Sequence, residues 1–389
     1  MNQYARLLAD LSEAGALGAE WRGAFERAPR SAFVPDTVWV SDETVTRGYR
    51  PVVRTVDAEE WTNAVNADDV VVTQLDNGEA HGPGISTSSS SMPSLVVKML
   101  RHLDVAEGHR VLDIGTGTGW TAALLSARLG SEQVTTVEVD AGLLARAEVR
   151  LNALGFSPTC VYADGTQNDA GSAPFDRIHS TAAVQRVPGR WISQTRPGGV
   201  IVTPWGTPYC NAGLAKLTID AEGEAAEGSF VENVSFMWVR NQRPATEPDA
   251  PEADRIGASV MDPERALENV DSAFSIGLRV PGTRYSHHWK DADRSATLRM
   301  ILHDSEGSWA SVRYQNWDRA DAVEQFGPRS LWDEVVQARG WWEAQGEPEL
   351  TRFGLTVTAE GGQDVWLDTP DNLVTGGFMS QIQRSNGKE

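Results

Sequence analysis

Three glycines at alternate positions follow a short aliphatic run, Val111–Ile114. They are Gly115, Gly117 and Gly119, and a segment with helical spacing of its apolar positions begins at Trp120. The aliphatic run predicts a buried strand, and the next segment predicts a helix. Glycines between them let the backbone turn sharply and approach a ligand without intervening side chains. A strand, a glycine turn and a helix start are together typical of a nucleotide cradle at the carboxyl end of a strand.

An acidic residue sharpens this interpretation. A second predicted strand, residues 133–137, ends in Glu138, whose carboxylate is placed to accept hydrogen bonds from ribose hydroxyls. A dinucleotide fingerprint has its third glycine one position after Gly119, where the helix packs closely on the strand. Trp120 occupies that position and is too bulky for the role, so the pattern favours S-adenosylmethionine over NAD. The alternative is a tight turn in any parallel sheet, with Glu138 merely solvated.

Composition limits the classes of partner. The 389 residues predict two or three domains, and no run approaches the roughly 18 apolar residues of a membrane span. We see no secretory signal at the start, and two cysteines cannot build a disulfide framework, so a reducing cytoplasmic location is expected. The formal net charge of −20 argues against nucleic acid or anionic membranes as partners.

The chain divides into four predicted regions. The first two are an N-terminal helical cap and loop region (1–84) and a cofactor-binding region in which strands and helices alternate (85–240). The last two are a proline-spaced polar linker (241–257) and a C-terminal α+β domain (258–389). Within the cap we expect helices over residues 1–48, and we interpret Trp21–Pro35 as a packing segment with little chemistry in it. In the last region, runs such as Phe274–Val280 predict strands and Leu331–Glu343 predicts a helix.

A hydroxyl-rich stretch, Ile85–Pro93, lies between a glycine loop and the helix that precedes the cofactor strand. Such a stretch is often a flexible linker ending in a helix cap. Its fixed place before the cofactor strand makes it a candidate substrate loop instead.

These segments, taken in order, resemble the protein-L-isoaspartate O-methyltransferase family over residues 18–240. The matching motifs are Phe33–Pro35, the hydroxyl stretch, Leu112–Gly119, Ala163–Gly165, Phe175–Ala183 and Arg196–Val202. The resemblance implies an α/β fold of the class I methyltransferase type: a Rossmann-like doubly wound sheet with an N-terminal helical cap and a C-terminal α+β domain. It also implies S-adenosyl-L-methionine as the cofactor. The implied cofactor contacts are Asp113, Gly115, Thr116, Gly117, Gly119, Glu138 at the ribose, Val139, Asp164 near the adenine amino group, and Gly165.

The family's catalytic serine maps to Ser91, with Ser89 at a threonine position and Ser90 at an isoleucine position, and Met92 replaces a glutamine. The three serines are our candidate catalytic residues, because hydroxyls hold a carboxylate by hydrogen bonds without protonating it. Candidate substrate contacts are Ser88, His81 and His179. The two histidines do not indicate a serine hydrolase, since no Gly-x-Ser-x-Gly elbow accompanies them. We expect no metal site.

The residues beyond 240 set this chain apart from ordinary repair enzymes. They resemble the longer family members associated with ribosomally synthesised modified peptides such as graspetides, lanthipeptides and lasso peptides. That resemblance implies methyl esterification of one aspartate in a macrocyclic precursor peptide, leading to a succinimide (aspartimide) that either persists or hydrolyses to isoaspartate. The alternative is repair of isoaspartate in damaged proteins. We expect a chain ending near Arg240 still to bind cofactor but to lose activity on the cyclic peptide.

Overall fold

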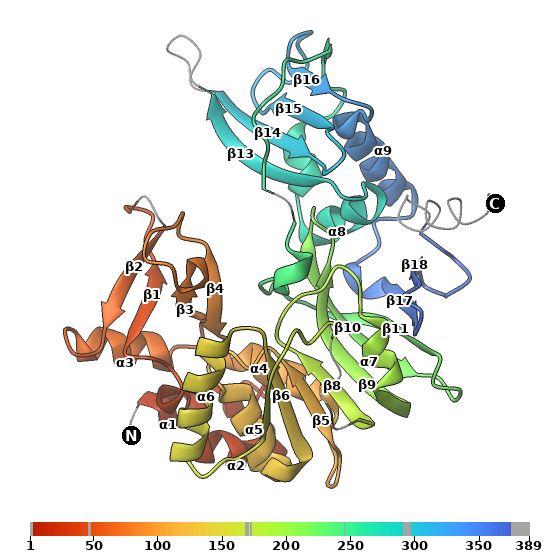
Figure 1. Ribbon diagram of the computed structural model, residues 1–389. Helices are drawn as coiled ribbons and strands as arrows, with labels where there is room; N and C mark the ends of the chain where they lie inside the picture. Colours follow the sequence, from red (N-terminus) through yellow and green to blue (C-terminus); the bar gives the residue numbers. More distant parts are fainter. Residues whose placement is uncertain are drawn as a thin grey trace. The chain divides into compact units, whose positions relative to one another are not determined.

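The computed structural model describes residues 3–45, 48–167, 171, 173–244, 246–290 and 297–374. A parallel sheet with strand order β9-β8-β5-β6-β7 carries the glycine turn (Figure 1). Its strands are β5 (Val111–Ile114), β6 (Val134–Glu138), β7 (Thr159–Tyr162), β8 (Phe175–Ser180) and β9 (Thr195–Gly206). The chain leaves β5 toward β6 and β7 on one side and later adds β8 and β9 on the other. Ligands of such sheets bind at the carboxyl ends of the strands where this reversal occurs.

Three helices pack against this sheet. They are α4 (Pro93–Leu103) on β8, α5 (Trp120–Leu129) on β5 and β6, and α6 (Ala141–Ala153) on β6 and β7. Short helical segments η3 (Ser131–Gln133) and α7 (Gly189–Ser193) complete the connections. Asp140 starts α6 by accepting hydrogen bonds from the backbone N–H groups of Gly142 and Leu143. The alternation of apolar strands and helices in the sequence predicted this region correctly.

The N-terminal cap combines helices with a four-stranded antiparallel sheet, in the order β2-β1-β3-β4. Its elements are α1 (Gln3–Glu13), α2 (Ala19–Arg27), η1 (Arg30–Ala32), β1 (Thr37–Ser41), β2 (Tyr49–Val53), α3 (Ala58–Asn66), β3 (Val71–Leu75), η2 (Asp76–Gly78) and β4 (Ser86–Ser90). Two expectations were wrong here: residues 37–41 are a strand rather than helix, and residues 86–90 of the hydroxyl stretch form the strand β4 rather than a loop, with Ser91 directly after it. Alternation explains the first, because Val38 is buried against Trp61 and Val65 while its neighbours are more exposed.

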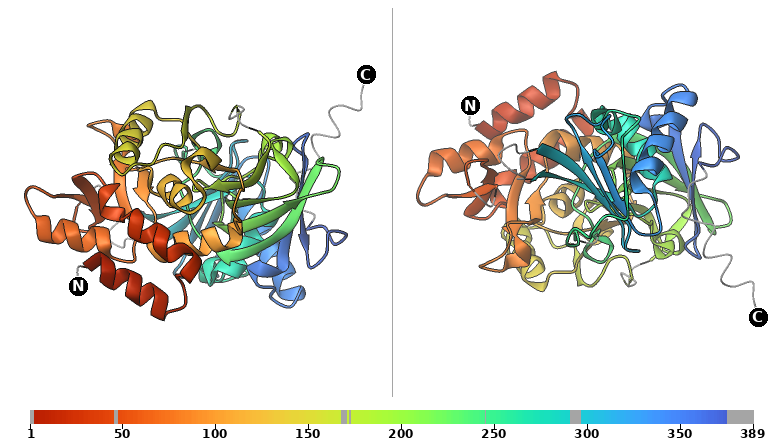
Figure 2. Two further views of the ribbon diagram at one scale, coloured as in Figure 1. Left: turned by 90° about the horizontal axis from the view of Figure 1, so that it is seen from below. Right: turned by 90° about the horizontal axis from the view of Figure 1, so that it is seen from above.

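A second compact unit contains residues 183–189, 203–217 and those from 225 onward. One of its sheets has the order β18-β17-β11-β10, and the other is a five-stranded sheet, β12-β16-β15-β14-β13. The strands are β10 (Asn211–Ile219), β11 (Ala225–Asn233), β12 (Arg255–Gly257), β13 (Arg284–Lys290), β14 (Thr297–His303), β15 (Trp309–Arg313), β16 (Val323–Phe326), β17 (Phe353–Thr358) and β18 (Gln363–Leu367). The helical segments are η4 (Arg240–Gln242), η5 (Pro263–Leu267), α8 (Val270–Arg279), α9 (Leu331–Ala344) and η6 (Leu350–Arg352). Helix α9 lies alongside the five-stranded sheet (Figure 1; Figure 2).

This unit differs from the separate domain that we expected over residues 258–389. Strand β17 pairs antiparallel with β11, so that Ala225 lies opposite Thr358, and the C-terminal part of the chain thereby extends the sheet of the β10–β11 hairpin. Phe274–Val280 is not a strand but lies largely within α8. Asn269 caps that helix by accepting a hydrogen bond from Ser272 N at 2.8 Å. Residues 375–389 of the expected domain lie outside the described residues.

Within the described ranges, no helix has the length and apolarity that crossing a membrane requires.

Candidate active site

The glycine turn leaves β5 with all three glycines in the left-handed region, at φ 90° for Gly115, 54° for Gly117 and 90° for Gly119. Other residues rarely adopt this conformation, so the turn depends on glycine. Gly119 also packs closely, because a Cβ there would lie 3.2 Å from the Cβ of Ala147 in α6. Helix α5 therefore begins directly after the turn at the carboxyl end of β5.

Glu138 spans this turn from the end of β6. One carboxylate oxygen, Oε2, accepts a hydrogen bond from Gly117 N at 2.9 Å, and Oε1 accepts one from Asp140 N at 3.0 Å. The backbone thus fixes the acid where an adenosine ribose is expected.

A buried polar network lies at the base of the turn. Asp113 is 0% exposed; its Oδ2 accepts a hydrogen bond from Thr136 Oγ1 at 3.0 Å, and its Oδ1 lies 2.9 Å from His179 Nδ1. Thr136 Oγ1 is in turn 2.8 Å from Thr116 Oγ1 in the glycine turn. The expected ligand contacts of Asp113 and His179 are corrected here: both side chains are enclosed between neighbouring strands, and they support the turn from below. Nε2 of His179 is buried and has no hydrogen-bond partner among the described residues.

The expected adenine end follows β7. Asp164 Oδ1 accepts hydrogen bonds from both the N–H and the hydroxyl of Thr166, at 2.9 and 2.7 Å. A Cβ on Gly165 would lie 3.0 Å from Cγ2 of Ile114, so a side chain there would crowd the carboxyl end of β5. Val139, after Glu138, is 39% exposed and offers an apolar surface. A glycine cradle, a fixed carboxylate and an exposed apolar side chain fit an adenosyl group.

Strand β4 lies against the glycine turn, and the hydroxyls of residues 88–91 have different partners. A Cβ on Gly117 would lie 3.8 Å from Ser88 Oγ and 4.0 Å from the carbonyl oxygen of Ser89. Ser88 Oγ accepts a hydrogen bond from Thr73 Oγ1 at 3.3 Å. The hydroxyls of Ser89 and Ser91, by contrast, have no hydrogen-bond partner within the described part of the chain, and both residues are partly exposed.

Ser90 differs from the expectation that it helps to hold substrate. It is 2% exposed, and its Oγ accepts a hydrogen bond from Arg30 Nε at 3.0 Å. Alternation along β4 explains this placement, since Ser88 and Ser90 are buried while Ser89 is half-buried. Sequence reasoning missed Arg30, which lies in the segment that we interpreted as having little chemistry.

Asp76, at the start of the loop that leads into β4, also escaped sequence reasoning. Its carboxylate accepts hydrogen bonds from Gly84 N at 3.0 Å and Ile85 N at 2.8 Å, which closes the loop. Asp76, Asn77 and Gly78 are residues typical of a turn, but no local pattern specifies the hydrogen bonds from residues 84 and 85. His81, a candidate substrate contact, is exposed within the loop.

Trp120, the residue that distinguishes this turn from a dinucleotide fingerprint, points away from the cradle into the cap. Its side chain is 2% exposed, and Nε1 donates a hydrogen bond to the carbonyl oxygen of Ala28 at 2.9 Å. Its ring meets Phe25 of α2 edge to face at 5.6 Å. The first residue of α5 therefore joins the cofactor turn to the cap.

Neither thiol is suited to act as a nucleophile. Burial raises the pKa of Cys160, on β7, to about 11 and that of Cys210 to about 12. Both cysteines are free thiols, and at neutral pH they are protonated.

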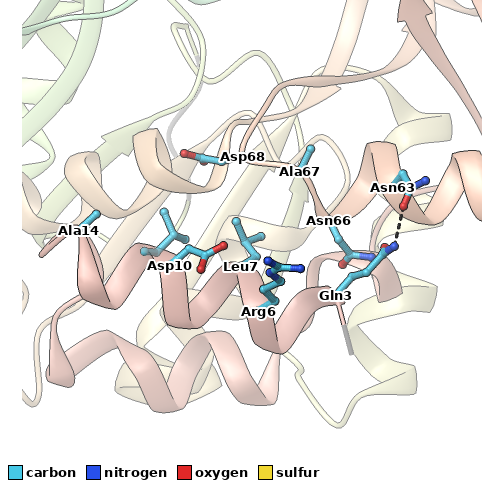
Figure 3. A pocket seen from close by; sticks show the side chains of 10 residues that line it. Gln3, Arg6, Leu7, Asp10, Ala14, Asn63, Asn66, Ala67 and Asp68 are labelled. Atoms are coloured by element: carbon cyan, nitrogen blue, oxygen red, sulfur yellow. Dashed lines mark hydrogen bonds between the residues drawn. The ribbon is translucent and has the colours of Figure 1, made fainter. Parts of the chain in front are cut away.

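A pocket of about 470 Å³ lies between α1 and α3 in the cap (Figure 3). Its polar lining includes Arg6, Asp10 and Asp68, and Gln3 Nε2 donates a hydrogen bond to Asn63 Oδ1 at 2.6 Å. None of the site residues expected from the sequence lines this pocket.

Known proteins match this site region. The family model described as protein-L-isoaspartate(D-aspartate) O-methyltransferase matches residues 51–243. A protein-L-isoaspartate O-methyltransferase of Methanothermobacter thermautotrophicus is 30% identical over 210 residues, which are 53% of this chain and 81% of the relative. The relative of the same name from Azorhizobium caulinodans is 38% identical over 148 residues, 38% of this chain and 66% of its own length. The match to the Xanthobacter autotrophicus relative, at 43% identity over 119 residues and 30% of this chain, spans only 53% of that protein.

A solved structure titled protein-L-isoaspartate O-methyltransferase extends the likeness in fold beyond the matched region. It aligns with a TM-score of 0.53 and 20% identity over 94% of this chain and all of that chain. The fold is that of a class I methyltransferase, and the family's cofactor is S-adenosylmethionine. From the relatives, the strand order and the glycine turn that ends β5, we conclude that the chain belongs to the protein-L-isoaspartate O-methyltransferase family.

Proposed function

We propose that the protein transfers a methyl group from S-adenosylmethionine to the side-chain carboxylate of isoaspartyl residues in peptides or proteins. Its named relatives support this activity. The observation that carries it furthest is the pair of hydroxyls on Ser89 and Ser91. They have no partner among the described residues, and the backbone of Ser89 lies beside Gly117. They are therefore available to donate hydrogen bonds to a ligand.

The chemistry needs placement more than proton transfer. Bound S-adenosylmethionine supplies an electrophilic methyl group on a sulfonium; a carboxylate oxygen bonds to that carbon as the S–C bond breaks, and the electron pair stays on sulfur. A carboxylate with a pKa of about 4 is already ionised at neutral pH, so no general base is required. Ser91 and Ser89 would donate hydrogen bonds to the carboxylate and align it, and alignment is a major source of rate.

The cofactor contacts follow from the geometry of the turn. In this proposal Glu138 accepts from the ribose hydroxyls, Val139 packs on the adenine, and Asp164 accepts from the adenine amino group. Gly115, Gly117 and Gly119 admit the ligand close to the backbone. Asp113 and Thr116 act from beneath, through the buried network.

A second candidate substrate is an aspartate constrained in a ring, as in a macrocyclic ribosomally synthesised peptide. One observation favours considering it. The chain continues well beyond residue 243, where the family match ends. The ester formed in such a ring could close to a succinimide by attack of the next backbone nitrogen.

Three peptides of one sequence distinguish these substrates: a linear isoaspartyl form, a linear aspartyl form, and an aspartyl form cyclised through other side chains. Each is incubated with S-adenosylmethionine, and mass spectrometry detects the methyl ester or the succinimide. The isoaspartyl form should have the highest kcat/KM. A clear preference for the ring would establish the second candidate, and no ester on any peptide would refute the methyltransferase activity.

Replacing Ser91 by alanine should lower kcat/KM for the preferred peptide about 10-fold to 100-fold, because a hydrogen bond to a charged group is worth about 1.5–3 kcal/mol. Affinity for S-adenosylhomocysteine, measured by calorimetry, should stay within a factor of two of the original. Ser86→Ala, at the other end of β4, is the matched control and should keep full activity. A lower kcat/KM in Ser86→Ala together with an unchanged kcat/KM in Ser91→Ala would show that the functional hydroxyl lies elsewhere in this segment.

A further inference from the structure

The guanidinium of Arg30 donates five hydrogen bonds next to the candidate site. The residue is 0% exposed. Nε donates to Ser90 Oγ at 3.0 Å and Nη2 donates to the Ser90 carbonyl oxygen at 2.8 Å. The other donors reach the carbonyl oxygens of Val65 (3.1 Å), Ala67 (3.2 Å) and Asp69 (2.8 Å). An arginine has five N–H donors, and here all five are satisfied.

This cation is buried among neutral acceptors. Its five hydrogen bonds go to carbonyl oxygens and one hydroxyl rather than to a carboxylate. Burial lowers the pKa of Arg30 to about 10, although the nearby charges of Asp68 and Asp69 oppose that effect. The side chain is therefore still charged at neutral pH. Placing a charge in a protein interior costs free energy unless all of its hydrogen bonds are made. We therefore expect a buried arginine of this kind to hold particular backbone segments in place.

Two structural elements meet at the guanidinium. Ser90 ends β4 and directly precedes Ser91, and residues 65–69 connect α3 to β3. A lysine could not replace the arginine, because an ammonium has three donors and no planar fork. We call the guanidinium of Arg30 and its five acceptors the Arg30 clamp. The clamp fixes both the backbone and the side chain of Ser90, the residue before Ser91.

Residues 28–30, the segment that contains Arg30, also contact the start of helix α5 next to the glycine turn. The carbonyl oxygen of Ala28 accepts the Trp120 hydrogen bond, and the Arg30 guanidinium carbon lies 5.6 Å from the centre of the Trp120 ring. Trp120 directly follows Gly119, the last glycine of the turn. Residues 28–30 thus contact the residue next to Ser91 and the residue next to the glycine turn.

We propose that Arg30 is a positioning residue for methyl transfer, which sets the place of Ser91 relative to the glycine turn. This inference rests on the proposed function. Methyl transfer requires the carboxylate oxygen in line with the methyl carbon, and a misplacement of about 1 Å can cost about 100-fold in rate. Loosening the hydrogen bonds of Arg30 should therefore lower kcat while cofactor binding is retained, because none of these bonds goes to Glu138 or the glycines and the hydrogen bond from Trp120 to Ala28 remains.

The test compares Arg30→Lys with Arg22→Lys, an exposed arginine of the same cap that pairs with Glu26 at 3.0 Å. Turnover of the unmodified protein on the isoaspartyl and cyclic peptides comes first, since its absence would refute the proposed function rather than this inference. For folded Arg30→Lys we expect kcat to fall about 10-fold or more, with KM for S-adenosylmethionine and affinity for S-adenosylhomocysteine within a factor of two. Arg22→Lys should match the original in every readout.

A double-mutant cycle separates positioning from a direct role of Ser90. Ser90→Ala removes one of the five acceptors and should lower kcat by a few fold. If Ser90 acts through Arg30, adding it to Arg30→Lys should lower kcat no further. Should Arg30→Lys not fold, Ser90→Ala decides alone, and an unchanged kcat overturns the proposal. An unchanged kcat in folded Arg30→Lys, or a loss of cofactor affinity equal to the loss in kcat, overturns it as well.

Discussion

Thr136 has a single hydroxyl hydrogen, and it donates this hydrogen to Asp113. The 2.8 Å contact with Thr116 must then use the hydroxyl hydrogen of Thr116. The direction of the chain of hydrogen bonds is thereby fixed from the glycine turn to the carboxylate, and His179 adds a contact from β8. These hydrogen bonds join residues of β5, β6 and β8 to the glycine turn, so the network should hold the turn in its ligand-binding shape.

Replacement of Thr136 by valine keeps the shape of the side chain and removes the hydroxyl. Oδ2 of Asp113 then loses its donor, so the free energy of unfolding should fall by about 1–3 kcal/mol. Cofactor affinity should weaken too, because Thr116 loses its acceptor. Chemical denaturation and calorimetry measure the two effects, and Thr136→Ser, which restores the hydroxyl, is the control. Equal stability of the valine variant and the original protein would contradict the role given to this network.

The sequence predicted those elements that a local pattern of apolar residues and glycines specifies. Strand β5, helix α5 and the position of Glu138 were predictable because apolar runs and glycine spacing specify them within a few residues. Helix α8 was not, since Phe274 and Ile276 also alternate as in a strand and only the cap at Asn269 favours a helix. Arg30 escaped for a different reason: its acceptors at residues 65–69 and 90 are remote in sequence, and no local pattern specifies such a clamp.

The start of α5 offers a test at the level of one element. Gly119→Ala places a Cβ in the left-handed region and 3.2 Å from Ala147, so unfolding should require about 1–3 kcal/mol less. Gly23→Ala is the matched control, because Gly23 lies exposed inside α2 and a Cβ there would meet nothing within 4 Å; it should stabilise the protein by about 0.5–1 kcal/mol. Thermal and denaturant unfolding report both changes. Similar stabilities for the two variants would contradict the close packing of α5 on α6.

At the scale of the whole molecule, an aromatic cluster ties together segments far apart in the second unit. Phe274 of α8 meets Phe230 of β11 edge to face at 5.0 Å and lies 5.8 Å from Phe353 of β17. Trp205 completes the cluster, 5.2 Å from Phe230. The sequence indicated two cores because the linker suggested a boundary, but residues on both sides of that linker build this one.

A chain ending at Arg240 would lack Phe274 and Phe353 and would leave β11 without its partner β17. Losing a buried phenylalanine costs about 3–5 kcal/mol, so we expect β10 and β11 to lose their ordered packing. Near-ultraviolet circular dichroism should weaken, and a hydrophobic dye should bind. A chain ending at Val374, which keeps every described residue, is the control. Cooperative unfolding of the shorter chain without dye binding would contradict the shared core.

The pairing of β11 with β17 also imposes an order on events at the ribosome. About 120 residues separate the two strands, and synthesis at about 5–20 residues per second delays β17 by on the order of ten seconds. During that interval the edge of β11 has no neighbour from the C-terminal part of the chain, and Phe230 lacks its later partners. An unpaired edge of this kind invites pairing with other chains. Yield in the cell should therefore depend on chaperones that shield nascent strands.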